Sequence, residues 1–151
     1  MAIFDIEDYT LPSFEFVDWV KTKEAMGIFL QTFKVNRERI GLPACPQLTN
    51  DGLLKKFDDP IKKKNRNLLT EYEKAYLQTE SCFFHAFTAI MHPYRPEVTQ
   101  RRRRVFFYRY LYGLSILAVS ERVHFQRNII INDSKMAIIQ FTLALDLLFY
   151  E

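Results

Sequence analysis

Apolar residues recur every three or four positions along most of the chain, which is the spacing of one face of an α-helix. The first series predicts a helix from about Phe14 to Phe33, with Ser13 as its N-cap. A second series predicts a helix from about Asn67 to Met91, ended by the following proline. Thr70 and Glu73 have the spacing of a capping box, although both would lie inside a helix that begins at Asn67.

Two later stretches, residues 105–119 and 136–150, are apolar on nearly every side. One predicted helix runs from about Pro96 to Phe125 and the other from Lys135 to Tyr150, with Asp133 or Ser134 as the cap of the second. A helix of this kind in a soluble protein is enclosed by its neighbours. We therefore expect a central apolar helical hairpin, about 96–127 and 134–150, with residues 128–133 as a turn or a short extended piece.

Strand patterns are weak throughout, so the economical fold is all-α, a bundle of four to five helices. A chain of 151 residues can bury one core, and we expect a single helical domain over 1–151. Residues 43–66 read as a basic connector that holds one short helix, capped by Asn50 or Asp51 and ended before Pro60.

The composition favours a folded chain with unusual aromatic content. Hydrophobic residues make up 48% and charged residues 26%, which excludes a disordered chain and argues against a membrane protein with several spans. The chain has 14 Phe and 8 Tyr but only 4 Gly. This excess fits either an aromatic-rich core or surfaces that bind partners, because aromatic residues are enriched in both.

Positive charge is concentrated in the middle of the chain. Residues 55–127 carry 15 basic and 7 acidic side chains, whereas residues 1–54 carry 5 and 8, and residues 128–151 carry 1 and 3. The middle can attract an anionic partner, or the acidic ends can fold back and cancel its field. The pattern leaves both interpretations open.

Two basic clusters are the candidate partner-binding or anion-binding residues. They are Lys62, Lys63, Lys64 and Arg66 in the connector, and Arg101, Arg102, Arg103 and Arg104 at the start of the apolar stretch. Consecutive residues turn by about 100° around a helix, so the four arginines cannot share one face. The clusters, with nearby tyrosines, also allow nucleic-acid binding, although no RNP, KH, zinc-finger or glycine-rich phosphate motif accompanies them.

The apolar stretches are too short to span a membrane. Residues 105–119 and 136–150 are 15 residues each, against the roughly 20 that a spanning helix needs. A peripheral contact, with the arginines at lipid headgroups, is the alternative to a buried helix. Arg109 and Asp146 are charges within these stretches, and we expect either a buried ion pair between two antiparallel helices or two side chains that reach the surface.

Signals for catalysis are weak. His85, His92 and His124 have no metal-ligand spacing, and no glycine lies in a phosphate-binding motif. We therefore predict no catalytic residue, metal, cofactor or small-molecule substrate. Cys45 and Cys82 fit free thiols of a reducing intracellular compartment, and an acidic N-terminus excludes an ordinary secretory signal.

These observations predict a non-catalytic interaction protein, a small accessory or scaffold subunit of a larger assembly. Its partners would be other proteins or further copies of the chain, in an organelle membrane complex or in a viral or ribonucleoprotein particle. The alternative function is a helical nucleic-acid-binding module that uses Arg101–Arg104 and Lys62–Arg66.

Overall fold

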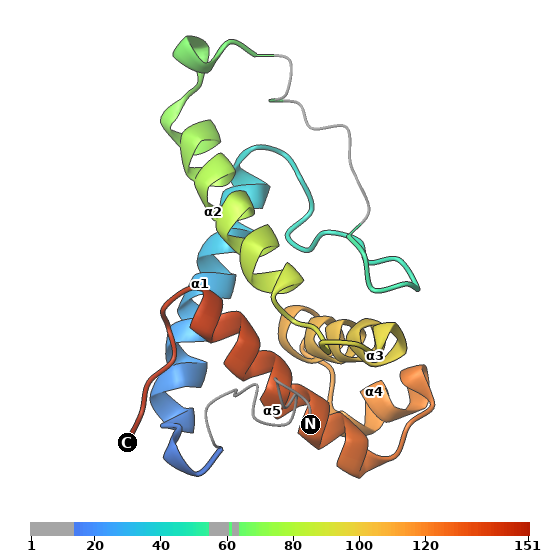
Figure 1. Ribbon diagram of the computed structural model, residues 1–151. Coiled ribbons are helices and arrows are strands. Elements are labelled where there is room, and N and C mark those ends of the chain that lie inside the picture. The colour runs from blue at the N-terminus through green and yellow to red at the C-terminus, as the bar shows by residue number, and fades with distance from the viewer. Residues whose placement is uncertain (1–13, 55–60, 62–63) are drawn as a thin grey trace.

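The computed structural model describes residues 14–54, 61 and 64–151, without the side chain of Arg66. These residues form five α-helices and no β-strand, so the expected all-α fold is confirmed (Figure 1). The helices are α1 (Trp19–Arg39), α2 (Glu71–Thr88), α3 (Pro96–Phe106), α4 (Ile116–Val123) and α5 (Arg127–Ala144).

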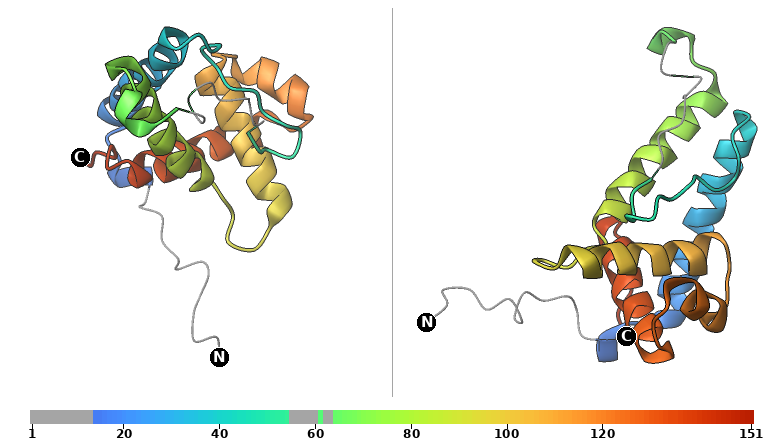
Figure 2. Two further views of the ribbon diagram at one scale, coloured as in Figure 1. Left: turned by 90° about the horizontal axis from the view of Figure 1, so that it is seen from above. Right: turned by 90° about the vertical axis from the view of Figure 1, so that its right-hand side faces the viewer.

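Helices α1 and α2 lie side by side, and one end of this pair extends beyond the other three helices (Figures 1 and 2). Helix α1 is capped by Asp18, whose side chain accepts from the backbone N–H of Lys21, and not by Ser13, which lies outside the described residues. Helix α2 begins with the predicted capping box, in which Thr70 and Glu73 satisfy each other's backbone N–H groups. The capping box is therefore formed, and α2 begins at Glu71 and not at about Asn67.

The expected continuous helix over 96–125 is wrong. Helix α3 ends at Phe106 and passes into a π-helical turn, Phe107–Leu111, after which Gly113 has a φ of 72°. Glycine adopts this left-handed conformation without a steric penalty, so the chain reverses there. Ser115 then caps α4, which packs back against α3 and buries Val105.

The last helix also differs from its expected bounds. Helix α5 begins at Arg127, so Asp133 is a buried residue of its interior, 1% exposed, and not an N-cap. Burial of Ile130 against Val119 and Val123 outweighs the weak helix preference of β-branched residues over 128–133. The helix ends at Ala144, because Asp146 is left-handed with a φ of 57° and Leu147 N–H donates to the Thr142 carbonyl.

The core is rich in phenylalanine. Phe83 stacks on Phe33 with ring centroids 4.2 Å apart and meets Phe141 edge-on at 5.9 Å, which joins α1, α2 and α5. The main cluster of buried residues contains Met26, Leu30, Phe33, Phe83, Ala86, Phe87, Ile90, Phe106, Phe107, Leu111, Ala137, Ile138 and Phe141. Six of the fourteen phenylalanines of the sequence therefore belong to this cluster.

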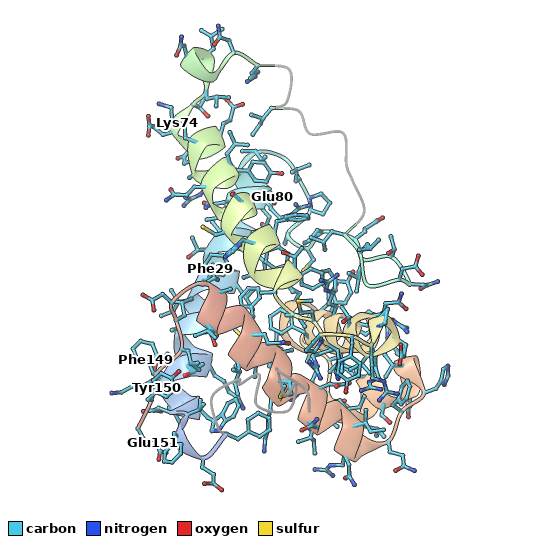
Figure 3. The ribbon with its side chains drawn as sticks, in the orientation of Figure 1. Phe29, Lys74, Glu80, Phe149, Tyr150 and Glu151 are labelled. Carbon is cyan, nitrogen blue, oxygen red and sulfur yellow. The ribbon has the colours of Figure 1, made fainter. Side chains whose placement is uncertain are left out.

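The segment after α5 returns along α1. Asp18 N–H donates to the Phe149 carbonyl at 2.9 Å, and Glu151 N–H donates to the Phe16 carbonyl at 2.9 Å. Figure 3 shows Phe149 and Tyr150 beside the first turns of α1. The C-terminal residues are thus bound to the start of the helical structure.

Candidate functional site

The four arginines Arg101–Arg104 leave α3 in different directions, as the 100° rotation per residue requires. Arg101, Arg102 and Arg103 form hydrogen bonds with other described residues, and Arg104 does not. Their acceptors come from α5 and from the chain that leaves α2. We call Arg101, Arg102 and Arg103 with Asp133 the arginine hub.

Arg101 makes a two-pronged ion pair with Asp133 of α5. Its Nε donates to Oδ2 at 2.6 Å and its Nη2 donates to Oδ1 at 3.2 Å. The guanidinium carbon also lies 4.9 Å from the centre of the Phe125 ring. A bidentate, charge-assisted pair of this kind fixes both distance and orientation, so it joins α3 to α5.

Arg102 is almost fully buried and holds the segment that connects α2 to α3. Its Nη1 donates to the Met91 carbonyl at 2.9 Å, and its Nε lies 3.6 Å from Asp133 Oδ1. Gln140 of α5 also binds Met91, because its side-chain amide donates to the Met91 carbonyl and accepts from the Met91 N–H. Burial lowers the pKa of the Arg102 guanidinium, and the Arg101 charge adds to this effect while Asp133 opposes it.

Arg103 donates hydrogen bonds to backbone carbonyl groups at the C-terminal end of α2 and just after it. Its Nε donates to the Ile90 carbonyl at 2.8 Å and its Nη2 donates to the Thr88 carbonyl at 3.0 Å. The last carbonyls of a helix lack partners within the helix and carry partial negative charge, so a guanidinium there is favourable. The hub therefore ties α2, α3 and α5 together from within, and Asp133, an acidic residue of the C-terminal segment, pairs with two of the central arginines.

Arg104 takes no part in the hub. Its guanidinium carbon lies 5.8 Å from the centre of the Tyr108 ring, and its Nε is buried without a hydrogen-bond acceptor among the described residues. Among the described residues, Arg104 is thus the one arginine of the four without a hydrogen bond to, or an ion pair with, another residue.

The predicted ion pair between Arg109 and Asp146 does not form. Arg109 Nη1 donates to the Tyr110 hydroxyl at 3.1 Å, and its guanidinium lies over the same ring. Asp146 is exposed, because α5 ends before it and the chain reverses there. The buried carboxylate of this region is Asp133, which the sequence suggested only as a helix cap.

The connector cluster is only partly described. Lys62 and Lys63 lie outside the described residues, and the backbone of Arg66 begins a 3-10 turn, Arg66–Leu68. Lys64 Nζ lies 3.0 Å from a carboxylate oxygen of Glu73. The hydrogen bonds from Lys64 and from the Thr70 backbone lower the pKa of Glu73. The expected short helix is not seen over Asn50–Gly52, which form a turn, and residues 55–60 are outside the description.

A cavity of about 370 Å³ lies between the C-terminal end of α1 and the N-terminal end of α2. It is lined by Arg39, Ile40, Ile61, Lys64, Thr70, Tyr72 and Glu73. Its polar side chains already have partners: Arg39 lies over Tyr72 at 5.3 Å, and the capping box occupies Thr70 and Glu73. This arrangement holds the two helix ends together.

Comparison with protein-family models, curated proteins and solved structures found no match. Over the described residues, no three or more His, Cys, Asp or Glu side chains are grouped to hold a metal ion. None of the helices in the same part of the chain has the length and hydropathy to cross a membrane.

His92, in the connection between α2 and α3, should make stability depend on pH. Burial lowers the pKa of its imidazole below the ordinary value of 6.5, and the charges of Arg102 and Arg95 add to this effect. The unfolded chain then takes up the proton first, so this contribution is present above pH 6.5 and is lost as the pH falls toward the folded pKa.

We expect the free energy of unfolding, measured in urea from pH 7.5 to pH 5, to fall less for His92→Gln than for the parent protein. His85→Gln, which changes an exposed histidine of α2, is the control and should retain the parental pH dependence. Identical pH profiles for the parent and His92→Gln would contradict the expectation.

Proposed function

We propose that this chain is a non-catalytic interaction protein, a small accessory or scaffold subunit that binds protein partners through its helical surfaces. The observation that carries the proposal is the exposure of large apolar side chains on three helices. Val20 and Ile28 of α1 are 77% and 65% exposed, Phe84 of α2 is 58% exposed and Leu117 of α4 is 69% exposed. Exposed large apolar side chains such as these can form part of a surface that binds another protein.

The outward face of α1 supports the proposal further. Val20 and Gly27 share one face by helical spacing, and a side chain added at Gly27 would meet nothing within 4 Å. Glycine inside a helix costs about 1 kcal/mol relative to alanine, and nothing in the described structure requires it there. A partner whose backbone approaches this face closely would account for the glycine.

Nucleic-acid binding through Arg101–Arg104 has less support. Three of these side chains are engaged with Asp133 and with backbone carbonyls, so they are not available to phosphates. Cys45 and Cys82 are free thiols, which suits a reducing compartment. We therefore favour a protein partner within a larger intracellular assembly.

The proposal is tested with the double variant Val20→Ser, Ile28→Gln and the matched control Leu68→Gln, which changes a residue 73% exposed in the 3-10 turn before α2. After mild extraction of the native protein, chromatography with light scattering should show the parent and the control in a complex or an oligomer. The double variant should lose most of this association while its circular dichroism stays unchanged. A parent that migrates as a lone monomer, both in the extract and when concentrated, would contradict the proposal.

A further inference from the structure

Two arginines from different helices flank one tyrosine on the side of the molecule formed by α3 and α4. The guanidinium carbons of Arg104 and Arg122 lie 5.8 Å and 5.4 Å from the centre of the Tyr108 ring. Tyr112 stacks on Tyr108 with ring centroids 6.0 Å apart and is 45% exposed. We call Arg104, Tyr108, Tyr112 and Arg122 the Arg–Tyr cluster.

Among the described residues, the two positive charges of the cluster have no counter-ion. In the described part of the chain, no carboxylate lies within 4.0 Å of either guanidinium, and neither donates a hydrogen bond. Like charges beside one ring repel each other, and a buried N–H such as Arg104 Nε is costly without an acceptor. An anion bound at the cluster would offset the positive charge of both guanidinium groups. Arg101, Arg102 and Arg103 differ, since their acceptors lie within the chain.

The backbone turn that carries Tyr108 is held in place by contacts from other segments. Tyr108 belongs to the π-helical turn, a local geometry that is frequent at functional sites. The Leu111 carbonyl at the end of this turn accepts from Lys34 Nζ at 2.6 Å and from Cys45 Sγ at 3.6 Å. Contacts from α1 and from the segment after it therefore fix the turn, and a fixed turn positions Tyr108 before any partner arrives.

We propose that the Arg–Tyr cluster binds a carboxylate-bearing segment of a partner protein. The inference rests on the proposed function and names the chemistry of the partner. Guanidinium groups bind carboxylates through paired, charge-assisted hydrogen bonds, and arginine and tyrosine are enriched among the residues that dominate interface energies. The cluster offers one compact site and not a row of cations along a phosphate backbone, because the neighbouring arginines are engaged in the hub.

The test compares Arg122→Gln with Arg127→Gln in the full-length chain. Both arginines are exposed and each change removes one positive charge, but Arg127 at the start of α5 is not part of the cluster. The probe is a synthetic hexaglutamate peptide, titrated while the Nε–H resonances of arginine are followed by NMR. The Arg104 and Arg122 resonances should shift in the parent, and Arg122→Gln should weaken binding about tenfold. Arg127→Gln should bind as the parent does.

Three outcomes would overturn the inference. One is equal weakening by the two variants, which would indicate general charge attraction only. Another is tighter binding of inorganic phosphate or of a single-stranded oligonucleotide than of the peptide at the same resonances, which would make this a phosphate site. The third is a native complex that Arg122→Gln leaves intact, in which case the proposed function stands and only this site is wrong. A protein without any partner fails the proposed function, and it does so in the extraction experiment, independently of the peptide.

Discussion

Replacing Asp133 by Asn should destabilise the protein by about 3–5 kcal/mol, because it removes the negative charge that neutralises two buried or half-buried arginines. The side chain of Asp133 is 1% exposed and that of Arg102 is 6% exposed, so water cannot replace the lost partner. Asparagine keeps the shape of the residue and one carbonyl oxygen, which separates the effect of charge from that of packing. The free energy of unfolding in urea measures the loss.

Two further variants identify the cause. Asp146→Asn removes an exposed carboxylate that the sequence had suggested as the buried partner of Arg109, and it should change stability by less than about 0.5 kcal/mol. The double variant Asp133→Asn, Arg102→Met should lose less free energy of unfolding than the two single variants do in sum. The reason is that Arg102→Met removes a positive charge that Asp133→Asn leaves unpaired. A fully stable Asp133→Asn protein would show that the hub carries little of the fold's stability.

The sequence predicted helices best where spacing and end signals agreed. At the start of α2, Thr70 and Glu73 have the spacing of a capping box, and the structure forms this box. The same reasoning failed at Gly113, because a glycine within an apolar stretch does not reveal whether the chain continues or reverses there. It also failed over residues 128–133, where burial of Ile130 overrides the weak helix preference of three isoleucines.

The sequence predicted only part of the arginine hub. Helical geometry requires the four arginines to diverge, but it does not say what each one meets. Arg103 binds carbonyl groups of Thr88 and Ile90, and any sequence supplies carbonyl groups. The carboxylate that pairs with Arg101 is 32 residues away, inside a segment whose pattern suggested a helix start. Contacts of this kind depend on how helices cross, which periodicity does not encode.

Phe83 and Phe84 should give opposite results although they are neighbours in α2. The Phe83 side chain is 1% exposed and contacts the rings of Phe33, Phe87 and Phe141. Its replacement by alanine should cost about 3–5 kcal/mol, through lost burial and the cavity left behind. Phe84 is 58% exposed, so Phe84→Ala should change the free energy of unfolding by less than about 0.5 kcal/mol.

Comparing Phe83→Ala with Phe84→Ala also separates an effect on folding from an effect on association. If the exposed face of α2 binds a partner, Phe84→Ala should weaken the native complex or the oligomer while its urea unfolding curve stays parental. Phe83→Ala should shift the unfolding midpoint first, and it should affect association only as far as the folded fraction declines. Equal destabilisation by the two variants would mean that α2 turns a different face to the core, since consecutive residues lie about 100° apart around a helix. The aromatic residues of α2 thus divide between a core face that contains Phe83 and an exposed face that contains Phe84.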